Sequence, residues 1–121
     1  MKVMIFMKAT EGTEAGVPPD PEAINAMHNY NEALIAAGIL KDQILGGLLP
    51  TRFAKRIHFY GKNVTVTDGP FTETKEVIAG FALWEVKSME EALEWAKKSP
   101  ATMDCVVEMR PLYSPETWDP V

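Results

Sequence analysis

The sequence predicts an α+β domain in which strands and two helices share one core. Two runs, Val3–Met7 and Val77–Val86, are apolar at nearly every position, which is typical of strands buried on both faces. Two other segments, one after Asp20 and one from Ser88, carry apolar residues at helical spacing. Because the chain has 121 residues, we expect a single domain over residues 1–121.

Composition and charge argue against several classes of function. The net charge is −5 and no run of basic residues is longer than a pair such as Lys55-Arg56, so a nucleic-acid partner is not expected. Val77–Val86 is too short to cross a membrane, and the apolar run near the N-terminus is too short for a signal peptide. The single cysteine, Cys105, permits no internal disulfide. We therefore expect a cytoplasmic protein with no membrane contact.

The first helix is predicted to begin at Pro21 and to end before Gly38. Asp20 precedes it as an N-cap, proline is favoured at the first helical position, and glycine suits the left-handed residue that ends a helix. The segment before it, Glu11–Pro19, contains two glycines and two prolines, so we expect a loop there.

One stripe of this helix is apolar and is expected to face the sheet. It consists of Ile24, Met27, Leu34 and Ile35. At about 100° per residue, Asn31 falls inside the stripe and His28 falls at its edge. Both polar side chains are therefore expected to point toward the sheet.

Two alternating segments, Lys55–Tyr60 and Asn63–Thr67, predict a β-hairpin. Gly61 at the first turn position suits a type II′ turn, which pairs Tyr60 with Asn63 and sets the register of the other pairs. The apolar side of this hairpin holds Ile57, Phe59, Val64 and Val66. Its polar side holds Arg56, His58, Tyr60, Asn63, Thr65 and Thr67.

The segments on either side of the hairpin are less regular. Upstream, Ile39–Pro50 is ambiguous, with a short strand indicated only at Ile44 and Leu45. Downstream, Asp68-Gly69-Pro70-Phe71 predicts a sharp reversal before Val77–Val86, with the ring of Phe71 filling the core beneath it.

The C-terminal part of the chain predicts a second helix and a last strand. Ser88 and Glu91 match a capping box, and Lys97-Lys98 lies where a helix dipole favours cations. The inward face of this helix holds Met89, Ala92, Leu93 and Ala96. The last strand is predicted over Asp104–Arg110, and a tail with Trp118 follows it.

This order of elements is the split βαβ pattern of a ferredoxin-like βαββαβ fold with an added β-hairpin. Its two central strands would be Val3–Met7 and Val77–Val86, the most apolar segments of the chain. Two helices can cover only one face of such a sheet, so we expect a second copy of the chain to cover the other face in a homodimer. The alternative is a monomer whose long loop and tail cover that face.

A resemblance to a known family rests on four segments. They are Asp68-Gly69-Pro70-Phe71 followed by Thr72–Glu76, then Ala79-Gly80-Phe81, Ser88–Pro100, and Glu108–Pro111. Together they resemble the DGPF branch of the YCII-related family. The resemblance implies a dimeric α+β barrel fold. It also implies that some YCII-related relatives carry a His–Asp pair proposed as an active site. Relatives in the dimeric barrel superfamily isomerise or eliminate on small lactone-like substrates, and some DGPF proteins are associated with alternative sigma factors.

His28 and Asp68 are the candidate catalytic residues. Imidazole gains and loses a proton near neutral pH, so His28 could act as a general base in a groove between helix and sheet. The alternative is a helix-edge histidine satisfied by a neighbour. Asp68 could assist catalysis, or it could fix the turn through bonds to nearby backbone N–H groups.

Asn31, Arg56 and His58 are the candidate substrate-binding residues. Asn31 could orient a substrate carbonyl, while Arg56 and His58 share a strand face and could meet a substrate carboxylate. The alternatives are a satisfied backbone group for Asn31 and a solvated hairpin face for the other two. No spacing resembles a metal or phosphate site, so no metal and no cofactor is expected. Cys105 is expected to be buried and inert.

Two hypotheses about function follow. The first is a cofactor-free lyase or isomerase in which His28 carries a proton for a small-molecule substrate. The second is a non-catalytic dimeric module that binds a small ligand or a regulatory protein such as a sigma factor.

Overall fold

The computed structural model describes residues 1–73, 76–100 and 105–115. Its elements follow one another along the chain as β1 (Lys2–Lys8), α1 (Glu11–Glu14), α2 (Pro21–Ala36), β2 (Leu40–Gly47), a 3-10 turn (Thr51–Phe53), β3 (Lys55–Tyr60), β4 (Asn63–Asp68), β5 (Ile78–Glu85), α3 (Met89–Lys97) and β6 (Val107–Pro111).

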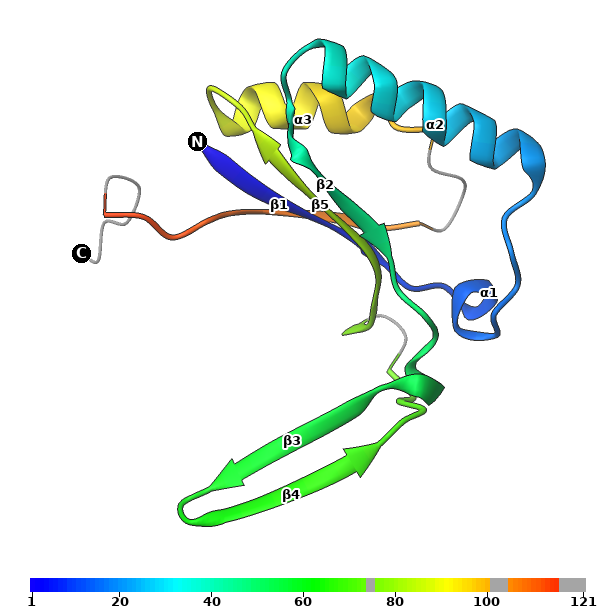
Figure 1. Cartoon of the computed structure of the whole chain (residues 1–121), viewed down its shortest axis with the longest axis vertical. Coiled ribbons are helices and arrows are strands. Elements are labelled where there is room, and N and C mark those ends of the chain that lie inside the picture. The colour runs from blue at the N-terminus through cyan, green and yellow to red at the C-terminus, as the bar shows by residue number, and fades with distance from the viewer. Residues whose placement is uncertain (74–75, 101–104, 116–121) are drawn as a thin grey trace.

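Four strands form one antiparallel sheet in the order β2-β5-β1-β6. The two most apolar strands, β1 and β5, are central, and both long helices lie on the same face of the sheet (Figure 1). This is the ferredoxin-like arrangement that the order of elements predicts. The prediction of an α+β fold with an added hairpin is confirmed.

Strand register decides which side chains face the helices. Val3 lies opposite Trp84 and Ile5 lies opposite Ala82, and this side packs against α2 and α3 in the hydrophobic core. Residues one position along point to the other face, because successive side chains of a strand alternate. That second face, called the back face below, carries two adjacent apolar pairs: Met4 with Leu83, and Phe6 with Phe81.

Local sequence sets the helix ends. The Asp20 carboxylate accepts a hydrogen bond from the Ala23 N–H at 2.8 Å, and Gly38 ends the turn after α2 with φ of 73°. The hydroxyl of Ser88 accepts from the N–H of Glu91, but the Glu91 carboxylate accepts from Lys87 rather than from Ser88. The predicted capping box is therefore only half formed, because the Glu91 carboxylate binds the N–H of Lys87, one residue before the N-cap Ser88.

The hairpin has the predicted register throughout. Tyr60 pairs with Asn63 and each following pair matches, as far as Arg56 with Thr67. Gly61 adopts φ of 61°, as the first position of a type II′ turn requires. The hairpin forms a separate two-stranded sheet, which lies on the opposite side of the main sheet from α2 and α3 (Figure 1).

One local prediction was wrong, and a segment that the sequence left ambiguous forms a strand. The expected loop contains the short helix α1, which Thr10 caps by accepting from the Thr13 N–H. The ambiguous segment forms β2, an edge strand whose register shifts where Asp42 and Gln43 adopt left-handed φ angles of 50° and 53°. The sequence indicated only Ile44 and Leu45 of this strand, because the shift breaks its alternation.

The last predicted strand is shorter in the described part of the chain. It begins at Val107, so Cys105 lies before it and is half-buried, and burial raises the pKa of its thiol. The first residue of the predicted strand, Asp104, lies outside the described residues, and so do Thr74, Lys75 and Trp118.

Candidate functional site

The residues predicted to form a site lie in three separate places. His28 is on the exposed side of α2, Asn31 is on its inner side, and the other three belong to the hairpin. Only Asn31 reaches the space between helices and sheet.

The prediction that His28 faces the sheet is wrong. Its side chain is 70% exposed, and its Nε2 lies 4.0 Å from the Glu32 carboxylate one turn later. The buried side of α2 is centred on Leu34 and also includes Tyr30, while Ile24 is exposed. At about 100° per residue, His28 falls about 120° around the helix from Leu34 and so faces solvent.

Asn31 lines a small cavity between α2, α3 and the sheet. The cavity has a volume of about 40 Å³. Its lining residues are Ile5, Met7, Tyr30, Asn31, Leu34, Ala82, Trp84, Ala96, Ser99 and Val107. A water needs about 10–15 Å³ of such volume, so the cavity accepts a few waters or one small polar head group.

Trp84, one of the residues that line this cavity, carries a buried hydrogen-bond donor without a partner in the described residues. It is only 3% exposed, and its indole Nε1–H has no hydrogen-bond partner among the residues that the structure describes. A buried Trp N–H usually finds a partner, because an unpaired buried donor costs about 1–3 kcal/mol. The cavity is therefore lined mostly by apolar residues, together with Asn31 and the tryptophan whose N–H the described residues leave unpaired.

Tyr30 also lines the cavity, but its proton is already engaged. Its hydroxyl donates to the backbone carbonyl of Trp95 at 2.6 Å, which ties α2 to α3. Burial raises the pKa of Tyr30 to about 12, so the phenol stays protonated at neutral pH. Its oxygen can still accept a hydrogen bond from a ligand or a water.

The three hairpin candidates engage neighbours on the hairpin and its base. Asp68 is the last residue of β4, and its carboxylate lies 2.7 Å from the Lys55 ammonium. The guanidinium of Arg56 lies 3.7 Å from the centre of the Phe71 ring. The rings of His58 and Tyr60 stack, with 6.0 Å between their centres. The ring of Phe71 thus packs against the Arg56 guanidinium. Phe71 does not belong to the hydrophobic core cluster, so the prediction that its ring fills the core is wrong.

The Asp68–Phe71 segment is anchored by two residues that sequence reasoning missed. The carboxylate of Glu14 accepts from both the N–H and the hydroxyl of Thr51, at 2.9 and 2.5 Å. The same hydroxyl accepts from the N–H of Phe71 at 3.0 Å. The sequence did not indicate a role for Glu14 or Thr51, because both residues lie in segments whose apolar residues show no regular spacing.

Gly69 fits where no other residue does. A Cβ atom at this position would lie 1.6 Å from the carbonyl oxygen of Thr51, which is backbone and cannot swing aside. Its N–H donates to the Ala54 carbonyl at 2.9 Å. The glycine of this segment thus allows the hairpin to close against the 3-10 turn, which is a structural role.

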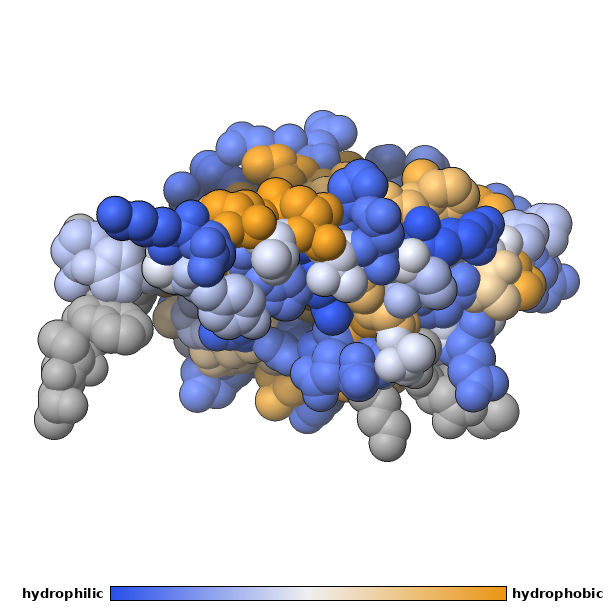
Figure 2. Space-filling view, turned by 90° about the horizontal axis from the view of Figure 1, so that it is seen from below, coloured by the Kyte–Doolittle hydropathy of each residue, from blue (hydrophilic) through white to orange (hydrophobic). Residues whose placement is uncertain are grey.

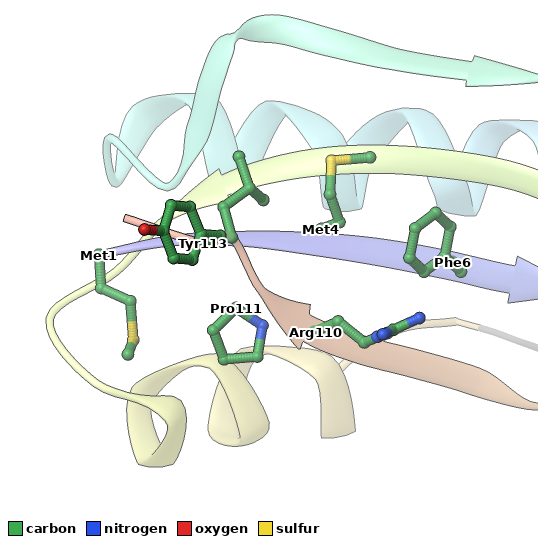
Figure 3. Close-up of a pocket in the computed structure, with 7 residues that line it drawn as sticks. Met1, Met4, Phe6, Arg110, Pro111 and Tyr113 are labelled. Carbon is green, nitrogen blue, oxygen red and sulfur yellow. The ribbon is translucent and has the colours of Figure 1, made fainter. Parts of the chain in front are cut away.

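A larger hollow lies on the back face. It is an open groove of about 630 Å³, lined by Met1, Met4, Phe6, Arg110, Pro111, Leu112 and Tyr113 (Figure 3). The labelled side chains are mostly apolar, and Arg110 is the cationic one among them. None of the residues predicted for a site lines this groove.

Within the described residues, His, Cys, Asp and Glu side chains do not gather in groups of three or more that could hold a metal ion. No helix in the described part of the chain has both the length and the apolar character needed to cross a membrane.

The chain matches the family model of the YCII-related domain over residues 1–116. It is 38% identical over 72 residues to an uncharacterized protein of Rhizobium meliloti (strain 1021), and the match spans 56% of this chain and 58% of that protein. Among solved structures it is similar to 5-chloro-2-hydroxyhydroquinone dehydrochlorinase from Burkholderia phenoliruptrix AC1100 in complex with 2,5-dihydroxybenzoquinone. That match has a TM-score of 0.49 and 20% identity, and covers 96% of this chain and 98% of that chain. The extent of the family match shows that the chain belongs to the YCII-related domain family.

Proposed function

We propose that the protein is a cytoplasmic homodimer that binds a small organic molecule in the cavity between the helices and the sheet. The observation that carries this proposal is the indole N–H of Trp84, which is buried and unpaired among the described residues. A ligand oxygen that accepts from this donor removes the cost of leaving it unpaired. A binding site with apolar walls and a few polar groups is the usual form of a small-molecule site.

The donors favour a ligand that carries a carbonyl or carboxylate oxygen. Trp84 offers one N–H, and the amide of Asn31 offers both donors and an acceptor. The present volume of about 40 Å³ accepts such a head group and little more. Larger ligands therefore need α2 and α3 to separate, and the Tyr30–Trp95 hydrogen bond is the contact that resists this.

The back face supports the proposed homodimer. Met4, Phe6, Phe81 and Leu83 form adjacent pairs there, and the two long helices lie on the other side (Figure 1). Each 100 Å² of apolar surface that a second copy removes from water contributes about 2.5 kcal/mol. A twofold axis would bring the same surface of both copies together.

The test uses the indole N–H signal of Trp84 in ¹H–¹⁵N NMR spectra. A panel of small aliphatic and aromatic carbonyl and carboxylate compounds is titrated into the wild-type protein. We expect at least one to shift this signal selectively, and we expect its affinity to fall about tenfold in Trp84→Phe, since a good hydrogen bond contributes about 1.4 kcal/mol. The matched control is Trp95→Phe, which keeps the carbonyl that Tyr30 contacts. A panel that never moves the signal, or that binds Trp84→Phe equally well, contradicts the proposal.

The second candidate is the cofactor-free lyase or isomerase with His28 as proton carrier. The observation that favours it is the pair formed by His28 and Glu32, since a histidine beside a carboxylate is a common proton-transfer unit. Asp68, Arg56 and His58 would assist only if a second copy brought the hairpin near α2. His28→Ala should then abolish turnover of a small-molecule substrate while the fold is kept. Full activity of that variant would exclude His28 as the base.

A further inference from the structure

The hairpin β3–β4 exposes one continuous apolar side. Ile57 lies opposite Val66 and Phe59 lies opposite Val64, so two cross-strand pairs are stacked next to each other. These four side chains are 56%, 59%, 73% and 58% exposed, in that order. Seen from the side on which the hairpin projects, the surface shows apolar patches among polar residues (Figure 2).

The hairpin is held only at its base within the described part of the chain. Arg56 lies over Phe71, and Gly69 donates to Ala54, but the core cluster contains no hairpin residue. A two-stranded hairpin alone is marginally stable in water and needs a surface to pack against. The apolar pairs near its middle therefore call for a covering surface that the protomer does not supply.

A second copy of the chain is the occupant that the geometry and the charge favour. The hairpin projects on the side of the back face, so a copy seated on that face comes within its reach (Figure 1). Residues 55–68 carry three basic residues and one acidic residue, a net charge of +2, while the whole chain carries −5. The rest of the chain therefore carries −7, and a positive arm complements an acidic body.

We propose that the apolar side of the hairpin is a clasp that packs against the body of the second copy. The clasp is formed by Ile57, Phe59, Val64 and Val66. This inference rests on the proposed homodimer and extends it, because the clasp is a surface separate from the back face. Twofold symmetry makes it reciprocal, with each copy holding the other.

The test compares two double variants by dilution calorimetry. Phe59→Thr with Val64→Thr removes one apolar pair but keeps residues that favour strands, and we expect the dimer dissociation constant to rise at least tenfold. Tyr60→Thr with Asn63→Thr changes the neighbouring pair on the polar side and also removes an exposed aromatic ring. This control should stay within about twofold of the wild type.

The outcomes separate the clasp from the homodimer. A wild-type protein that stays monomeric overturns both proposals. A dimer whose dissociation constant is unchanged in Phe59→Thr with Val64→Thr overturns the clasp alone.

A crosslinking experiment tests the clasp independently if the double variant does not fold. A photo-crosslinking phenylalanine analogue is placed at position 59, and ¹⁴N and ¹⁵N copies are mixed. Mixed-isotope crosslinks support the clasp. Crosslinks found only within one chain mean that the hairpin folds back on its own body, and they overturn it.

Discussion

At the scale of single residues, Gly69 and Trp84 illustrate two kinds of constraint. Gly69 has no side chain because the Thr51 carbonyl occupies the space that a Cβ atom would need. Trp84 fills the core with its ring but leaves its N–H unpaired among the described residues. The first constraint stabilises the fold, and the second leaves a buried donor that the described residues do not use.

Gly69→Ala should destabilise the protein by about 2–4 kcal/mol, because backbone atoms must move to admit the methyl group. Gly47→Ala is the matched control, since nothing lies within 4 Å of a Cβ atom at that position. The control should change stability by no more than about 0.5 kcal/mol. Urea unfolding of both variants measures the difference, and equal midpoints would contradict the close approach.

Tyr30 predicts a specific loss of stability at alkaline pH. Burial raises its pKa in the folded state to about 12, above the ordinary value of 10.0, so the folded protein binds the proton more tightly. The stabilisation is complete below pH 10 and is lost as the pH rises from about 10 to about 12. Tyr30→Phe should show a smaller loss of stability over this window than wild type.

The control for that experiment is Tyr60→Phe, because Tyr60 is exposed on the hairpin. It should follow the wild-type profile of unfolding free energy against pH. If Tyr30→Phe and wild type lose stability equally between pH 10 and pH 12, the hydroxyl of Tyr30 is not buried as described.

At the scale of elements, sequence patterns predicted the hairpin best. Its strict alternation allows only one register, and Gly61 fixes the turn, so every pair was predictable. The face of α2 was predicted less well, because Ile24 belongs to the apolar pattern yet is exposed. The spacing of apolar residues showed that α2 has a buried stripe, but it did not show that this stripe is centred on Leu34. His28 was therefore predicted on the wrong side of the helix.

Contacts between residues that are far apart in the sequence were not predictable from local patterns. Glu14 and Thr51 are 37 residues apart in the sequence and meet only because the chain folds back on itself. The same holds for the cavity, which gathers Asn31 from α2 and Trp84 from β5. The one available signal was the tryptophan itself, since a buried indole N–H needs an acceptor.

Thr51→Val tests the network that anchors the hairpin. It keeps the shape of the side chain but removes the hydroxyl that contacts Glu14 and Phe71. We expect a loss of about 1–3 kcal/mol, because the Phe71 N–H and the Glu14 carboxylate lose a partner. Thr51→Ser, which keeps the hydroxyl, should recover most of the stability in thermal unfolding. An equal loss in both variants would mean that the methyl group matters and the network does not.

At the scale of the whole molecule, the two faces of the sheet have different environments. The helix face holds the core and the small cavity, while the back face holds an open groove and adjacent apolar pairs. The ligand proposal belongs to the first face and the homodimer to the second, and the hairpin that carries the clasp projects on the side of that second face (Figure 1). Pairing of the back faces is the central claim, because it explains why so apolar a sheet has helices on one side only.

Sedimentation velocity over a range of concentrations tests this claim most directly, with Leu83→Glu compared against Ile24→Glu. Leu83 points to the back face opposite Met4, whereas Ile24 is an exposed apolar residue on α2. If the back faces pair, the wild-type protein sediments with twice the mass of one chain, and this species is kept in Ile24→Glu and lost in Leu83→Glu. A folded wild-type protein that sediments as a single chain at every concentration would contradict it.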